Sequence, residues 1–190
     1  MILHKTLYRL VSFLMALLML PAFAMGEATP PATDDQGRPY VLDAFDGTAL
    51  DLTPHQGKAI WLNFYTGWCS YCMKEMPDIK KAFETYDPDE VAIILVHAWS
   101  GEGGEASAEV IERFGLEEML HVEDQDLALT QIIGLEGFPT SIFITKDGYF
   151  TGRAYALTFE EMISYLDGMG VAKRADATTD APEATAEVAP

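Results

Sequence analysis

The two cysteines of this chain stand close together in the segment Cys69-Ser70-Tyr71-Cys72. They follow shortly after the apolar, strand-like run 59–65. If a helix begins at the first cysteine, residues i and i+3 lie on one face of it, near enough for an intramolecular disulfide. The spacing therefore predicts a redox centre that cycles between a dithiol and a disulfide.

A helix start gives the two sulfurs different roles. Unpaired backbone N–H groups and the positive end of the helix dipole stabilise a thiolate there, so we expect a lowered pKa for Cys69, the attacking nucleophile. Cys72 lies one turn further and is more shielded, and it would attack the mixed disulfide between Cys69 and a partner protein. Cys72 is thus the predicted resolving thiol.

Zinc and a purely structural disulfide are the alternatives for this pair. A structural zinc site needs about four ligands, whereas the sequence has no second cysteine pair and its histidines are scattered without ligand spacing. A disulfide that closes so short a loop would constrain the unfolded chain little. We expect no metal and no other cofactor, and we interpret Met73 and Met76 as helix packing rather than copper ligands.

Strand-like and helix-like segments alternate along the chain, which favours an α/β fold with a parallel core. Strands are expected at residues 59–65, 91–97, 120–122, 141–145 and 149–154, and helices at 71–86, 106–114, 128–133 and 159–167, the last one capped by Thr158. Two short strands at 40–45 and 48–52 should form an N-terminal hairpin, and 146–148 should turn the last strand pair. The acidic, glycine-containing segment 99–104 is interpreted as a flexible connection, because it lacks the order and the lysine of a phosphate-binding loop.

The ends of the chain differ in composition from the part between them. Residues 1–24 are typical of an export signal, because basic residues precede an apolar run and a small-x-small site that ends at Ala24. We expect cleavage there and an exported protein, periplasmic or otherwise extracytoplasmic; an uncleaved membrane anchor is the alternative. Residues 25–38 should form a flexible linker, residues 39–170 one folded domain and residues 171–190 a disordered acidic tail.

The formal net charge of the chain is −18. Nucleic acids and anionic membrane surfaces should repel so acidic a protein, so neither is expected as a partner. Most of the charge is interpreted as a solvated surface that maintains solubility. A monomer is the default expectation.

Several short motifs together carry a family resemblance. They are Gly57-Lys58, Asn63-Phe64, Trp68-Cys69-Ser70-Tyr71-Cys72, Glu75-x-Pro77, Gly137-Phe138-Pro139-Thr140 and Asp147-Gly148. Over residues 39–170 the chain resembles exported thioredoxin-fold proteins of the TlpA/ResA type, which are related to the cytochrome c maturation reductases. The resemblance implies a central mixed β-sheet flanked by helices, with an N-terminal β-hairpin and a strand-helix insertion between Val91 and Asp126.

The resemblance also implies two further parts of the site. Pro139 would be the cis-proline that faces the two cysteines, with the backbone of Phe138 left to pair with an extended substrate segment. The alternative for Pro139 is a plain strand start. Glu75 would take the proton of Cys72, which requires a carboxyl pKa raised by partial burial; the alternative is an ordinary acid in the first helical turn.

Aromatic residues and one departure from the family pattern complete the site. Trp68, Tyr65 and Tyr71 would form an apolar collar for substrate, with simple shielding of the disulfide as the alternative for Trp68. General thioredoxins place a buried aspartate where this chain has Asn63. That proton route is therefore absent, which gives Glu75 more weight.

The function implied is that of an extracytoplasmic thiol-disulfide oxidoreductase. We expect a reductase of disulfides in exported proteins, with apocytochrome c as the substrate class that the relatives suggest and a membrane thiol donor of the CcdA/DsbD kind as the electron source. Ser70-Tyr71 between the cysteines is neither the Gly-Pro of strong reductants nor the Pro-His of a strong oxidant. A disulfide-forming oxidant of the same fold therefore stays open, as does a copper-binding or redox partner module.

Overall fold

The computed structural model describes Val41 and residues 50–99 and 103–175. In this part of the chain the strands form one sheet in the order β3-β2-β1-β4-β5. The strands are β1 (Ala59–Tyr65), β2 (Val91–Trp99), β3 (Leu120–Gln125), β4 (Thr140–Ile144) and β5 (Phe150–Ala154), and the helices are η2 (Thr53–His55), α2 (Ser70–Thr85), α3 (Ser107–Phe114), α4 (Ala128–Ile133) and α5 (Phe159–Gly168). None of the helices formed by these residues is long and apolar enough to cross a bilayer.

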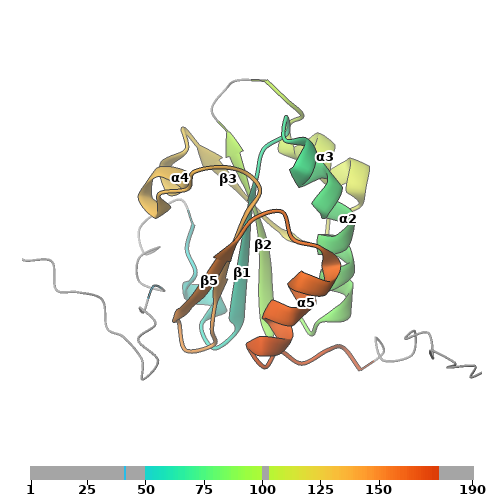
Figure 1. Cartoon of the computed structure of the whole chain (residues 1–190), viewed down its shortest axis with the longest axis vertical. Coiled ribbons are helices and arrows are strands. Elements are labelled where there is room, and N and C mark those ends of the chain that lie inside the picture. The colour runs from blue at the N-terminus through green and yellow to red at the C-terminus, as the bar shows by residue number, and fades with distance from the viewer. Residues whose placement is uncertain (1–40, 42–49, 100–102, 176–190) are drawn as a thin grey trace, which may run out of the picture. The chain divides into compact units, whose positions relative to one another are not determined.

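The sheet is mixed and has helices on both faces. β1 pairs in parallel with β2, and β2 with β3, whereas β4 runs antiparallel to both β1 and β5. Helices α2, α3 and α5 lie on one side of the sheet and α4 on the other (Figure 1). This arrangement is the thioredoxin-type α/β fold that the resemblance implies.

Each face of the sheet has its own apolar core. Trp61, Leu95 and Phe143 face α2 and α5, where Met76 and Met162 are fully buried against them. On the opposite face a second cluster contains β-strand residues and Leu129 of α4. β1 is buried along its whole length, which explains why it is a continuous apolar run rather than an alternating one.

The predicted strands and helices from residue 59 onward are present, with shifts at their ends. β1 and α4 have the bounds expected, whereas β2 continues to Trp99 and β3 to Gln125. The last residues of β3 are polar, and several are exposed because β3 is an edge strand. An edge strand lacks the continuous apolar signal of a central one, so its length was underestimated.

The expected N-terminal hairpin is wrong where the structure describes it. Neither Val41 nor residues 50–52 lie in a strand. Leu50 and Leu52 are buried and precede η2, so their apolar side chains fill the core under the sheet without pairing as a strand. The other hairpin residues lie outside the described part, as do the signal, the linker, residues 100–102 of the connection and residues 176–190.

Residues after α5 pack back onto the domain. The backbone N–H of Arg174 donates to Thr85 O at 2.9 Å, and its Nε donates to Tyr86 O at 3.0 Å. Lys173 forms a β-bridge with Tyr86, and Val171 is buried. The folded domain therefore extends beyond the boundary expected at residue 170, to Arg174 at least.

Candidate redox site

Cys69 and Cys72 lie at the N-terminal end of α2, one short turn after β1, and they are joined by a disulfide with their Cα atoms 5.2 Å apart. Cys69 is the N-cap residue, and its Sγ accepts the backbone N–H of Cys72 at 3.1 Å. The exposed fraction is 5% for Cys69 and 0% for Cys72. Because free N–H groups at a helix start stabilise a thiolate, this geometry suits Cys69 as the attacking sulfur and Cys72 as the shielded one.

Glu75 lies one turn beyond Cys72 on the buried side of α2, with an exposed fraction of 4%. Its Oε1 accepts the backbone N–H of Leu157 at 3.0 Å. Burial raises the pKa of Glu75 to about 7, against the opposing effects of the Leu157 N–H and the Asn63 amide, while the charge of Asp78 adds slightly to the rise. A carboxyl group of this kind can be ionised or protonated near neutral pH, which a proton acceptor requires.

Asn63 belongs to a buried polar group that links β1 and β4. Its Nδ2 donates to Ser141 Oγ at 3.2 Å, and the same oxygen accepts the indole N–H of Trp61 at 2.9 Å. Asn63 and Ser141 are partners in the antiparallel ladder. The sequence pattern marks Asn63 only as a departure from the family, and its contact with Ser141 becomes visible only with the strand register.

The Phe138-Pro139 peptide bond is cis. It directly precedes β4, whose first residue, Thr140, pairs with Phe64 near the end of β1. The rings of Phe138 and Trp68 meet edge to face with their centroids 6.2 Å apart. The structure thus brings the Pro139 segment against the residue that precedes Cys69.

The aromatic collar is only partly as expected. Trp68 and Tyr71 are exposed, with fractions of 60% and 64%, and Lys74 lies over the Tyr71 ring. Tyr65, in contrast, is fully buried and cannot contact a substrate. It is the last residue of β1, and the alternation of the strand points it into the core; its inclusion in the collar was wrong.

Backbone packing beside the cysteines was not foreseen. A Cβ on Gly67 would overlap the carbonyl of Glu105, and one on Gly104 would lie 2.6 Å from the backbone N of Trp68. Glu105 is in turn held by an ion pair with Arg113 of α3. Small residues at positions 67 and 104 therefore let the β2–α3 connection lie directly on the chain before Cys69.

A titratable row crosses three neighbouring strands on the same sheet face. Tyr65, His97 and Glu123 are consecutive register partners, and His97 Nδ1 lies 2.8 Å from Glu123 Oε2. The Tyr65 and His97 ring centroids are 5.0 Å apart. Burial, together with the charge of Glu123, raises the pKa of Tyr65, which keeps this phenol neutral.

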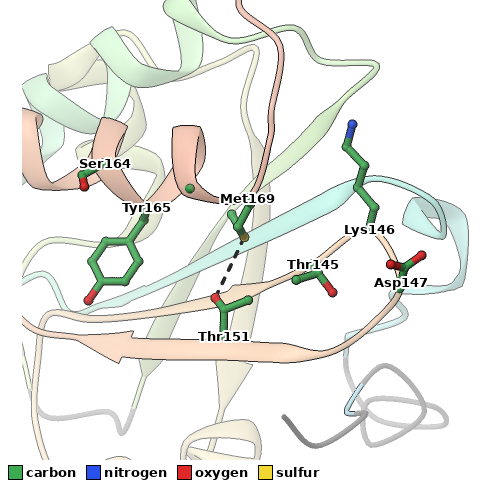
Figure 2. Close-up of a pocket in the computed structure, with 8 residues that line it drawn as sticks. Thr145, Lys146, Asp147, Thr151, Ser164, Tyr165 and Met169 are labelled. Atoms are coloured by element: carbon green, nitrogen blue, oxygen red, sulfur yellow. Dashed lines mark hydrogen bonds between the residues drawn. The ribbon is translucent and has the colours of Figure 1, made fainter. Parts of the chain in front are cut away.

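Figure 2 shows a pocket at the other end of the sheet. It is lined by Lys146 of the β4–β5 turn, by Thr151 of β5, and by the last turns of α5 with Met169 that follows them. Because β4 starts beside Pro139 and runs away from it, this pocket is remote from the disulfide. Among the described residues, no group of three or more His, Cys, Asp or Glu side chains could hold a metal ion.

Comparisons with known proteins agree with this site. The profile of the Redoxin family matches residues 21–156, a range that includes both cysteines, Glu75 and Pro139. The thiol-disulfide oxidoreductase ResA of Geobacillus thermodenitrificans is 32% identical over 122 residues, which are 64% of this chain and 68% of that protein. ResA of Bacillus anthracis is 30% identical over 128 residues, 67% of this chain and 72% of that protein.

Solved structures are similar in fold. The thioredoxin domain of a thiol-disulfide oxidoreductase from Bacteroides vulgatus aligns with a TM-score of 0.54 and 20% identity, and covers 63% of this chain and 84% of that chain. The exposed lipoprotein thioredoxin of Streptococcus pneumoniae aligns with a TM-score of 0.51 and 20% identity, and covers 62% of this chain and 89% of its own. At this identity the likeness concerns the fold alone.

Proposed function

Because the chain belongs to the redoxin family and is a thiol-disulfide oxidoreductase of the ResA type, we propose that it works outside the cytoplasm as a reductase of protein disulfides. The observation that carries the proposed exchange is the position of Glu75, a buried acid with a pKa of about 7 one helical turn beyond Cys72. The reductive direction rests on the resemblance to the cytochrome c maturation reductases. A reductive cycle requires Cys72 to lose its proton once in each turnover. We assign this role to Glu75, the buried acid one turn further along α2.

The proposed cycle begins with both cysteines reduced. The Cys69 thiolate attacks one sulfur of a substrate disulfide, forms a mixed disulfide and releases the other substrate sulfur as a thiolate. Cys72 gives its proton to Glu75 and attacks Cys69 Sγ, so the second substrate sulfur leaves. The substrate has then gained two electrons, and Cys69 and Cys72 share the disulfide that the structure contains.

Substrate contact is assigned to the residues around the disulfide. The exposed rings of Trp68 and Tyr71 offer apolar contact area on either side of Cys69. Phe138 and Pro139 precede the β4 ladder, so the backbone of Phe138 is the proposed edge to which an extended substrate segment would pair.

The proposed partners and compartment rest on the family resemblance and on the composition of residues 1–24. The proposed substrates are disulfide-containing exported proteins, with apocytochrome c as the class considered first. A membrane thiol donor would restore the reduced enzyme, because disulfides persist outside the cytosol unless electrons are supplied. Residues 1–24 would direct the export.

The reduction potential of the Cys69–Cys72 pair tests the direction of the reaction. The full chain is equilibrated in glutathione and thioredoxin redox buffers, and the oxidised fraction is measured by alkylation and mass spectrometry. We expect a reduction potential close to that of thioredoxin, which is about −270 mV. A reduction potential close to that of DsbA, about −120 mV, would make the protein an oxidant and contradict the proposed reductase function.

A pair of single-cysteine variants tests the roles assigned to the two sulfurs, beginning with Cys72→Ser. It keeps the attacking sulfur and lacks the resolving one, so it should accumulate mixed disulfides through Cys69. A Cys69→Ser variant should accumulate none.

A further inference from the structure

Asn63 lies fully buried near the end of β1, on the sheet face that carries Trp61 and faces α2. One amide N–H donates to Ser141 Oγ at 3.2 Å. An asparagine amide nitrogen carries two N–H groups, so a second donor is left. A buried donor without an acceptor costs free energy, which makes its direction significant.

Ser141 anchors this amide to β4. Its Oγ accepts from Trp61 Nε1 at 2.9 Å, and an indole nitrogen can only donate. The Ser141 oxygen therefore lies between two nitrogens, Trp61 Nε1 and Asn63 Nδ2. The Asn63 nitrogen is in this way held toward β4, next to the space between β1 and α2.

The Glu75 carboxyl has a buried oxygen that lacks a donor. Its Oε1 already binds the Leu157 N–H at 3.0 Å, but Oε2 is buried and has no partner of ordinary hydrogen-bond geometry among the described residues. The groups that act on this carboxyl are the Leu157 N–H from the segment before α5, the Asn63 amide from β1 and the charge of Asp78 from α2 itself. Of these, the Asn63 amide is the side-chain donor.

We propose that Asn63 is a positioning residue for thiol-disulfide exchange: its second amide N–H, oriented by Ser141, donates to Oε2 of the ionised Glu75. The inference rests on the proposed role of Glu75 as proton acceptor for Cys72. A carboxylate can take a proton only if it is ionised beforehand, and burial alone favours the neutral acid. Asn63 keeps a useful fraction of Glu75 ionised near neutral pH without adding a second charge to the core.

The test follows the Glu75 carboxyl directly. In the oxidised full chain, carbon-detected NMR of labelled glutamate side chains gives the titration midpoint of Glu75, and the Glu75→Gln variant identifies its signal. In Asn63→Leu we expect the midpoint to rise by about one pH unit, and the rate of mixed-disulfide resolution below the midpoint to fall about tenfold. Ser141→Ala removes only the residue that anchors Asn63. It should raise the Glu75 midpoint and lower the resolution rate, each by a smaller amount than Asn63→Leu does.

Thr130→Val serves as the control for general destabilisation. Thr130 is also a buried polar residue, but it lies in α4, on the opposite face of the sheet. Its hydroxyl donates to Asp124 of β3. This variant should leave the Glu75 midpoint unchanged. An equal shift in Thr130→Val and Asn63→Leu would overturn the inference.

The outcomes separate this inference from the proposed function. If Asn63→Leu or, should that variant not fold, Ser141→Ala leaves the Glu75 midpoint in place, Asn63 has no positioning role. If the midpoint rises but Glu75→Gln exchanges with the same pH profile as the natural protein, Asn63 does act on Glu75 and the proton role of Glu75 fails.

Discussion

Glu75 illustrates how a single buried acid links folding to chemistry. Its carboxyl has one backbone donor, from Leu157, and is otherwise surrounded by the core around α2 and α5. Burial raises the pKa from the usual 4.5 to about 7, so the ionised form is the less stable one in the folded protein. An acid tuned in this way costs stability at the pH where it is useful.

This predicts a pH dependence of stability. Because the folded pKa is raised, the contribution of Glu75 is fully present below pH 4.5 and is lost as the pH rises through about 7. Glu75→Gln keeps an acceptor for Leu157 but cannot ionise, so relative to this variant the natural protein should lose about 2.5 kcal/mol of unfolding free energy between pH 5 and pH 8. Urea unfolding of both oxidised proteins at the two pH values measures the difference, and parallel pH dependences would contradict it.

The site residues that the sequence predicts best are those with local causes. The spacing of Cys69 and Cys72, and of Glu75 one turn on, follows from helix geometry alone, and the structure places all three at the start of α2 or on its buried side. The role of Asn63 depends on Ser141, 78 positions further along the chain. Such a pair becomes visible only when the register between β1 and β4 is known.

At the scale of elements, the central strands were predictable because burial on both faces gives long apolar runs. The polar edge strand β3 and the residues before η2 have no such signal. The packing of residues 171–174 was also missed, because this short segment has neither a helical nor a strand-like period. Its contacts are mostly backbone hydrogen bonds and one arginine side chain, which a sequence pattern does not reveal.

Arg174 should stabilise the C-terminal end of α2. Its guanidinium donates to the carbonyls of Tyr86 and Phe83, which have no partner further along the helix, and its positive charge lies at the negative end of the helix dipole. We expect Arg174→Ala to lower the unfolding free energy by about 1 kcal/mol. The rate of disulfide exchange should not change, because the cysteines are at the opposite end of α2.

Lys173→Ala is the matched control for this prediction. Lys173 is a neighbouring cation whose ion pair with Asp167 is largely exposed, and such pairs contribute little. Thermal unfolding of the two variants decides the point: an Arg174→Ala variant as stable as Lys173→Ala would mean that the helix end needs no cap.

At the scale of the whole molecule, the redox site and the pocket of Figure 2 occupy opposite ends of one sheet. Cys69 and Cys72 lie at the start of α2, whereas the pocket lies between the β4–β5 turn and the last turns of α5.

Export of the chain is testable in cells. If residues 1–24 are a signal that is removed after Ala24, the exported protein begins at Met25. N-terminal sequencing of the protein from the extracytoplasmic fraction of a bacterial host should give Met25. Recovery of an intact Met1 end from membranes would show that the segment is an uncleaved anchor.

The different environments of Trp61 and Trp68 have a practical consequence. Trp61 is fully buried and hydrogen-bonded, whereas Trp68 is 60% exposed and directly precedes Cys69. An indole in water beside a sulfur–sulfur bond is well placed for its emission to be quenched by that bond. A redox-dependent change in the emission of Trp68, measured above the emission of Trp61 and Trp99, can therefore serve as a label-free optical signal of turnover.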